Sequence, residues 1–247
     1  NDGTGGHIPP TTIDLPTLPT QIIAGDVDDD DAVDLVVSGH GLTLLHNDGL
    51  GGLEVSSIPR KPLGWGPMDN YQYASIADVD GDGQQDVITV WDYNCTPPDV
   101  PFPCYGWSLA VFLGDGLGGF DGGNTVVDRG GFLPSPPWSI LSGDLDEDGD
   151  LDILLPVGLG VLLENAGGSA PHEHGVSLLF PSCGLIDYDG DGTLDYVGLS
   201  NVWDPALENS VPRVTWSRNN FDDRSTTFEH HASVKSDSGN HLAADMD

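Results

Sequence analysis

Short apolar runs alternate with aspartate- and glycine-rich segments along the whole chain. The apolar runs, such as residues 35–37 and 87–90, are rich in β-branched and aliphatic side chains. Runs of this kind between Asp/Gly clusters are typical of strands joined by tight turns. With 34 Gly and 19 Pro among 247 residues, few stretches can sustain a helical period. The pattern therefore predicts an all-β fold, and the length suits one large domain or two small ones.

Four of the polar segments share a nine-residue motif with aspartate at positions 1, 3, 5 and 9. Carboxylates at these positions of a tight turn can converge on one hard cation, and the backbone carbonyl at position 7 can add an oxygen. Calcium accepts about six to eight such oxygens, so we predict a Ca²⁺ site in each copy. A fifth copy begins just as the chain stops. The predicted ligands are Asp26, Asp28, Asp30, Ala32 and Asp34; Asp78, Asp80, Asp82, Gln84 and Asp86; Asp144, Asp146, Asp148, Asp150 and Asp152; Asp187, Asp189, Asp191, Thr193 and Asp195; and Asp245 and Asp247.

The details of the motif favour this interpretation over two others. A glycine at position 6 suits a sharp turn in three copies, and Asp31 replaces it in the first. An EF-hand loop would need a bidentate Glu later in the loop and a helix on either side, whereas here both flanks are predicted strands. Solvated acidic turns are the simpler alternative, but four copies in register argue against them.

A second, glycine-rich motif alternates with the first and begins at Asn47, Asp115 and Asn165. Each copy follows an apolar run and has the composition of a tight hairpin turn. Residues 1–6 repeat this turn, and residues 214–221 hold a degenerate version of it. One unit is thus strand, metal loop, strand, connection, strand, glycine-rich turn and strand.

The spacing of the units is typical of a β-propeller. The first aspartates of successive metal motifs are 52, 66, 43 and 58 residues apart, as expected of blades that carry insertions. Small residues such as Ala24, Ala77 and Gly143 precede the metal loops, where innermost strands would crowd around a central channel. This feature favours a propeller over a sandwich. We expect one propeller domain with four-stranded blades over about residues 20–62, 72–135, 138–180 and 181–236, and partial blades at 1–19 and 240–247.

Together the two motifs resemble the FG-GAP/VCBS repeats of integrin α-subunit propellers. The pairing of Asp-x-Asp-x-Asp-Gly-x-x-Asp with a later Asp115-Gly-Leu-Gly-Gly-Phe120 carries the resemblance, which covers essentially the whole chain. It implies a β-propeller with calcium between the first two strands of each blade, on the lower face, and ligands on the upper face. It does not imply one activity, because such repeats serve adhesion, sugar binding and scaffolding.

The broken units at both ends leave three arrangements open. The chain could form a five-bladed ring whose last blade is shared by both termini, a piece of a longer propeller, or an open module completed by a neighbouring subunit. The last arrangement would give a head-to-tail contact that does not close, and such contacts generate filaments.

Charge narrows the range of partners. Seven basic residues face forty acidic ones, and four bound calcium ions would change the formal charge from −33 to about −25. Nucleic acid is excluded because phosphate binding needs clustered Lys and Arg, and an anionic membrane surface is disfavoured for the same reason. No apolar run is long enough to span a bilayer. The chain begins at Asn1 without Met, so we expect a processed product.

The cysteines favour an extracellular location. Cys95 and Cys104 bracket a Pro-rich segment, and a disulfide between them would add about 2.5–3 kcal/mol by the chain-entropy estimate. The alternative is two unrelated thiols, and Cys183 is left over in either case. Asn94 begins a glycosylation sequon. Calcium sites and a loop disulfide together are typical of secreted proteins.

Other candidate functional residues lie in the segments between the repeats. Aromatic rings on propeller loops can stack on sugars, although they can also fill gaps between blades. His172 and His174, like His230 and His231, could bind a transition metal. No nucleophile elbow, zinc-protease helix or phosphate loop is present. The candidate ligand-binding aromatic residues are Trp65, Tyr71, Tyr73, Trp107 and Trp138.

The sequence thus predicts an extracellular, calcium-stabilised propeller that acts as a structural or adhesive binding module without catalysis. Its expected partners are other proteins or glycans, or further copies of itself. A carbohydrate-binding lectin, a filament subunit with blades completed between subunits, and a fragment of a secreted hydrolase remain as alternatives.

Overall fold

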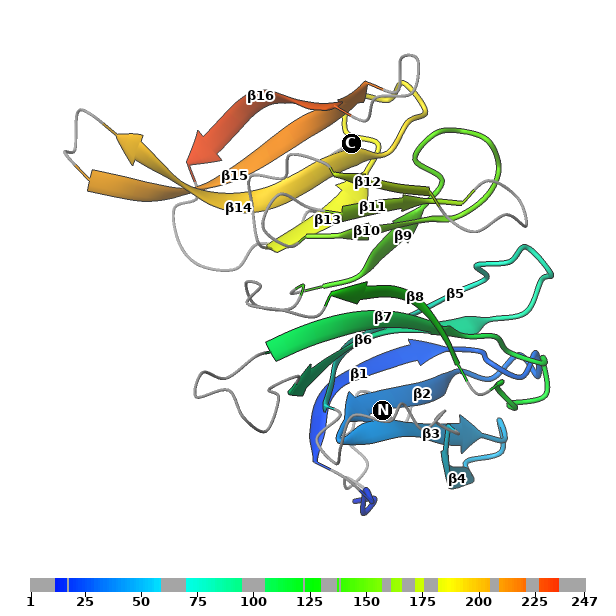
Figure 1. The fold of residues 1–247 in the computed structure, drawn as a ribbon. Helices are drawn as coiled ribbons and strands as arrows, with labels where there is room; N and C mark the ends of the chain where they lie inside the picture. Colours follow the sequence, from blue (N-terminus) through cyan, green and yellow to red (C-terminus); the bar gives the residue numbers. More distant parts are fainter. Residues whose placement is uncertain are drawn as a thin grey trace, which may run out of the picture.

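The computed structural model describes residues 12–16, 18–58, 70–94, 105–121, 123–129, 137, 139–156, 161–165, 172–175, 182–204, 209–220 and 227–235. These residues form strands and turns and contain no helix, so the all-β prediction is confirmed. The sixteen strands make four antiparallel sheets, and the strands of each sheet are consecutive in the chain and paired in chain order (Figure 1).

The first sheet contains β1 (Pro19–Gly25), β2 (Asp34–Gly39), β3 (Gly41–Asn47) and β4 (Leu53–Ser57). The second contains β5 (Asn70–Ala77), β6 (Asp86–Asn94), β7 (Tyr105–Phe112) and β8 (Asn124–Arg129). The third contains β9 (Leu141–Gly143), β10 (Asp152–Leu155), β11 (Val161–Glu164) and β12 (His172–Gly175). The fourth contains β13 (Ser182–Ile186), β14 (Asp195–Asp204), β15 (Asn209–Asn220) and β16 (Thr227–Lys235).

Both faces of the inner sheets are covered, which explains why their strands are continuous apolar runs rather than alternating ones. Val87 of β6 packs with Val36 and Leu44 of the first sheet, whereas the adjacent Ile88 packs with Ile153 and other residues of the third sheet. A third cluster joins Leu154 and Leu162 of the third sheet to Tyr196 of the fourth. Three apolar layers therefore hold the four sheets together in chain order.

The first strands of successive sheets lie next to each other, since β1 contacts β5, β5 contacts β9 and β9 contacts β13. Space there is tight: a Cβ on Gly143 would lie only 2.6 Å from Cδ1 of Leu194, and one on Gly25 only 3.1 Å from Ile76. Small residues at these strand ends thus allow neighbouring sheets to approach. Four-stranded sheets packed through their first strands are compatible with propeller blades, and in the part of the chain described here they form an open row rather than a closed ring (Figure 1).

Several predicted features fall outside the described residues. These are residues 1–11 of the predicted partial blade 1–19, the whole predicted partial blade 240–247, Cys95, Cys104, Trp65, Trp138, Asp245 and Asp247. Asn94, Tyr71 and Cys183 lie in strands β6, β5 and β13, whose backbone alone is described at these positions.

Candidate metal centres

Each of the four predicted metal loops within the described residues connects the first two strands of a sheet. We call residues 26–34, 78–86, 144–152 and 187–195 the first to fourth loops and number their positions 1 to 9. In the second, third and fourth loops, side-chain oxygens at positions 1, 3 and 9 lie within 4.8 Å of one another. The residues brought together are Asp78, Asp80 and Asp86; Asp144, Asp146 and Asp152; and Asp187, Asp189 and Asp195.

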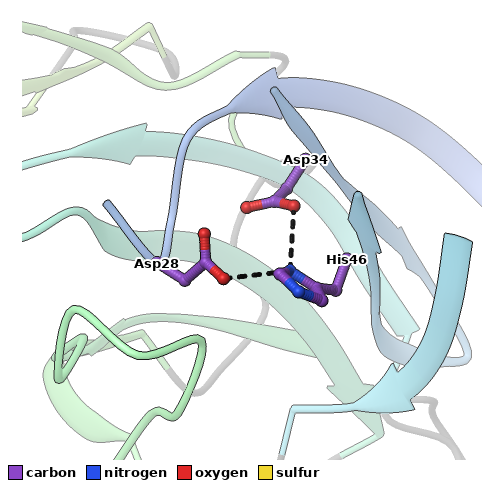
Figure 2. Close-up of side chains that lie close together, drawn as sticks. All are labelled: Asp28, Asp34 and His46. Carbon is purple, nitrogen blue, oxygen red and sulfur yellow. Dashed lines mark ion pairs between the residues drawn. The ribbon is translucent and has the colours of Figure 1, made fainter. Parts of the chain in front are cut away.

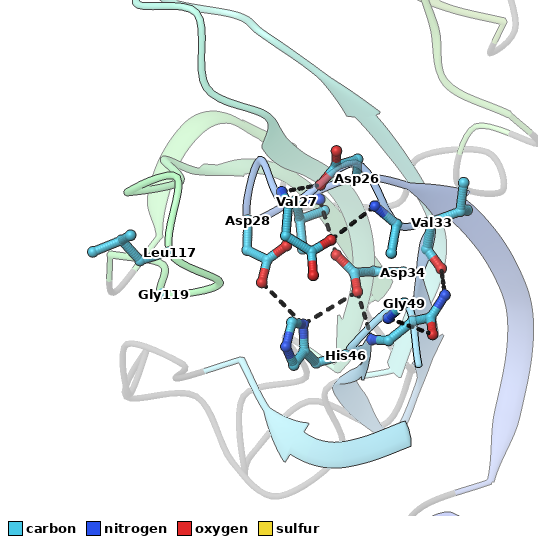
Figure 3. A network of polar contacts seen from close by, with 12 residues as sticks. Asp26, Val27, Asp28, Val33, Asp34, His46, Gly49, Leu117 and Gly119 are labelled. Atoms are coloured by element: carbon cyan, nitrogen blue, oxygen red, sulfur yellow. Dashed lines mark hydrogen bonds and ion pairs between the residues drawn. The ribbon is translucent and has the colours of Figure 1, made fainter. Parts of the chain in front are cut away.

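The first loop is arranged differently from the others. Here Asp26, Asp28 and Asp30, at positions 1, 3 and 5, form one group within 4.8 Å. A second group combines Asp28 with Asp34, at position 9, and with His46 of β3. Figure 3 shows these side chains converging, with the turn of the second sheet that carries Leu117 and Gly119 to one side of them.

The loop backbone enters the left-handed region twice in every copy. At position 6, φ is +91° for Gly83 and +68° for Asp31. Sequence reasoning anticipated this requirement for a sharp turn at position 6. It missed the same requirement at position 4, where φ is +74° for Gly81 and +60° for both Asp29 and Glu147. Aspartate is one of the few residues besides glycine that tolerate this region, which allows the first loop to lack both glycines.

Backbone amides hold the position-1 and position-5 carboxylates in place. In the second loop, the N–H groups of Gly81 and Gly83 donate to the two oxygens of Asp78, each at 2.9 Å. Asp82, at position 5, accepts the N–H of Gln84 at 2.8 Å. The other loops repeat the second contact at Asp30, Asp148 and Asp191. Outside the first loop, the position-5 aspartates therefore close the turn and are not among the converging oxygens.

The position-9 aspartates are fully buried and connect each loop to the end of the third strand. Asp152, which is 0% exposed, accepts the N–H of Leu145 at 2.8 Å and that of Asn165 at 2.9 Å. Asp34 accepts the N–H groups of Val27 and Asn47 at 3.0 and 2.7 Å. Asp86 and Asp195 make the equivalent pairs of bonds. Position 9 thus has a structural role that the sequence motif did not reveal.

Asparagines at the end of the third strand also join neighbouring sheets. The amide of Asn165 donates to the carbonyl of Val79 at 2.6 Å, and that of Asn219 donates to the carbonyl of Leu145 at 2.8 Å. In both pairs the acceptor is position 2 of the metal loop in the preceding sheet. The metal loop is therefore part of the junction between sheets as well as part of its own sheet.

Burial of carboxylates near other carboxylates disfavours their charged form. It raises the pKa of Asp152 to about 6, and it also raises the pKa of Asp86 and Asp195. The same cause raises the pKa of Asp28 and Asp146 at position 3. A divalent cation between these oxygens would offset the desolvation and the mutual repulsion.

The fourth loop carries its own counter-charge. Arg218 of β15 forms ion pairs with Asp191 and, at 3.1 Å from Nε to Oδ2, with Asp189. The Thr193 hydroxyl and the Arg218 guanidinium both hydrogen-bond to Asp191 and hold its pKa well below the usual range. The guanidinium thus neutralises part of the charge that a metal ion would otherwise neutralise.

Two of the candidate aromatic residues have described side chains. Trp107 is only 4% exposed and belongs to the apolar layer between the second and third sheets, so its ring is not available to stack on a ligand. Tyr73 is half-buried and packs against the same layer. Both side chains therefore pack in or against the layer between the second and third sheets.

The geometry shows several aspartate-rich groups that could hold a metal ion. No protein-family model matches the chain, and no curated protein sequence matches it either. The resemblance to FG-GAP/VCBS repeats therefore depends on the motifs alone. Among the described residues, no helix is both long and apolar enough to cross a membrane.

Proposed function

We propose that this chain is an extracellular β-propeller module stabilised by Ca²⁺, and that it has a structural or adhesive role without catalysis. One observation carries the proposal: all four sheets place converging carboxylate oxygens in the same loop, between their first and second strands. A single acidic turn would have little weight, but the same hydrogen-bonded frame recurs four times. In this proposal the described sheets are four blades of the propeller.

Calcium suits the oxygen donors better than the smaller Mg²⁺ does. Calcium accepts about six to eight oxygens in flexible geometry, whereas Mg²⁺ requires near-ideal octahedra and retains several waters. In the second loop, Asp78, Asp80 and Asp86 would supply carboxylate oxygens, and the carbonyl of Gln84 would add a backbone oxygen. The amides of Gly81 and Gly83 already orient Asp78, so little conformational entropy would be lost on binding.

Bound calcium would make the blades and their junctions rigid. The position-9 aspartates join loop to sheet, and Asn165 and Asn219 join two of the loops to the next sheet. Neutralising the buried carboxylates removes the repulsion that otherwise loosens this network. A rigid array of loops and blades is a suitable frame for binding other proteins or glycans. Because the loop carboxylates are engaged by amides and by the cation, they are poor candidates for acid–base catalysis.

Removal of the metal tests the proposal directly. Calcium at about 100 times its Kd would add about 2.7 kcal/mol of stability for each occupied site. Chelation should therefore lower Tm by more than about 10 °C in a chain of this size. Calorimetric titration of the stripped protein should give several calcium sites, and Mg²⁺ should bind them more weakly. An unchanged Tm after chelation, with no calcium heat, would refute the proposal.

A further inference from the structure

One position, at or just beyond the end of the third strand, carries a different residue in each sheet. It is the residue before the one whose N–H donates to the position-9 aspartate. The four residues at this position are His46, Leu113, Glu164 and Arg218. The loops therefore share a backbone frame but not a chemical environment.

In the first sheet this position places an imidazole against two carboxylates. Nδ1 of His46 lies 3.1 Å from Oδ2 of Asp28 and 3.3 Å from Oδ1 of Asp34. Figure 2 shows the imidazole beside the two carboxylates, with dashed lines for these two ion pairs. Nδ1 is buried, and it makes no hydrogen bond with any residue that the structure describes. Oδ1 of Asp28 is buried in the same way and likewise has no such bond. Two unsatisfied polar atoms thus lie in one small group.

Both contacts at Nδ1 have the length of ion pairs, but neither has the geometry of a hydrogen bond. A proton on Nδ1 needs a well-aligned acceptor, and neither carboxylate oxygen provides one despite the short distances. A cation between the three atoms accounts for this arrangement. Ligands about 2.0–2.1 Å from a tetrahedral Zn²⁺ ion lie about 3.4 Å from each other, close to the two distances seen at His46.

The surrounding contacts pre-organise such a site. The N–H groups of Val27 and Asn47 fix the carboxylate of Asp34, which is 0% exposed. Hydrogen-bonded ligands of this kind are typical of functional metal centres. Imidazole suits zinc and its first-row neighbours, whereas calcium prefers oxygen alone.

We propose that the first loop holds a divalent transition-series cation, of the Zn²⁺ class, through Asp28, Asp34 and His46. The other three loops have groups of carboxylate oxygens only and lack an imidazole at this position. The first loop is then a different metal centre within a series of calcium loops. The inference does not depend on calcium binding at the other three loops.

The test uses the 247-residue chain stripped of metal and titrated with Zn²⁺, with Co²⁺ as a spectroscopic probe. The unaltered protein should bind a Zn²⁺ equivalent that depends on His46, and Co²⁺ at this site should show the visible absorption of a tetrahedral centre. His46→Leu introduces the residue that the second sheet has at the equivalent position, so the fold should tolerate it. This variant should lose the Co²⁺ signal and bind Zn²⁺ more than about tenfold more weakly.

The matched control is His40→Leu, which removes an exposed imidazole outside the group and should leave Zn²⁺ binding unchanged. His46→Gln replaces the leucine variant if circular dichroism shows that the latter is unfolded. Unaltered Zn²⁺ binding in a folded His46 variant would overturn the proposal. Calcium is titrated separately: failure of calcium binding alone refutes the calcium function, whereas failure of the His46 dependence alone refutes this site.

Discussion

Replacing Asp152 with alanine should strongly destabilise the third sheet even without metal. The carboxylate is 0% exposed and accepts two backbone N–H groups, one from Leu145 in the loop and one from Asn165 after β11. Asp152→Ala leaves both donors without an acceptor. A buried unsatisfied donor costs about 1–3 kcal/mol, and the amide of Leu145 is the more deeply buried of the two. We therefore expect a loss of about 2–4 kcal/mol in chelator.

The assay is urea denaturation followed by circular dichroism, in chelator and then with calcium. A loss of this size corresponds to about 5–15 °C in Tm for a chain of this length. Asp150→Ala is the matched control, because it removes the same charge from the same loop and leaves the backbone carbonyl at position 7. It should change stability by less than about 0.5 kcal/mol in chelator.

The two conditions separate the two roles of Asp152. In calcium, Asp152→Ala should cost more than in chelator, because it also removes a proposed ligand. If Asp152→Ala and Asp150→Ala were equally stable in chelator, the structural role of position 9 would be wrong. If the cost were large but the same in both conditions, the hydrogen bonds would matter and the ligand role would not.

Three further expectations follow from the same loops. Gly83→Ala should lower the free energy of unfolding by about 1–2 kcal/mol because φ is +91° at this position, although a Cβ would meet nothing within 4 Å. The control in thermal melts is Gly184→Ala, where a Cβ is equally unhindered and φ is not positive. Arg218→Leu should tighten calcium binding at the fourth loop about two- to fivefold in calorimetry, and Leu113→Arg should weaken it at the second. Burial raises the pKa of Asp152 from 3.8 to about 6, so the folded metal-free protein takes up a proton before the unfolded chain does. Acidification from pH 7 towards 4 should therefore stabilise the metal-free protein. The same acidification should destabilise the calcium-bound protein, because protonated carboxylates release the cation.

The strands and loops were predictable because local pattern determines them. The apolar runs are bounded by Asp/Gly clusters, and the position-6 glycines mark turns that require positive φ. The spacing predicted that positions 1, 3, 5 and 9 converge, and in three loops the structure brings together positions 1, 3 and 9. In each of these cases the signal lies within a few residues of the structure that it specifies.

The missed features depend on residues that are distant in sequence. His46 lies in the third strand, and only the antiparallel return of β3 along β2 brings it to Asp28 and Asp34. The series to which it belongs appears when the repeats are aligned on Asn47, Gly114, Asn165 and Asn219. Trp107 lies within β7, which begins at Tyr105, and not in a segment between the repeats. Aromatic residues favour strands, and here that preference sets the start of the element.

The hydrogen bonds of loop position 2 imply that the metal loops do not act independently. The N–H of Leu145 bonds to Asp152 within the third sheet, and its carbonyl accepts the amide of Asn219 from the fourth. Asn219 in turn donates its own N–H to Asp195, which belongs to the fourth metal group. A carboxylate that shifts in one loop therefore displaces a residue that holds the next.

Between the first and second sheets, Gly114 stands in place of the asparagine. The contact there comes from the glycine-rich turn of the second sheet, where a Cβ on Gly118 would lie 3.6 Å from Cβ of Asp28. The second, third and fourth metal loops should accordingly be coupled more strongly to one another than the first loop is to the second. Metal binding at the first loop, which contains the contact with His46, should therefore depend least on the other three.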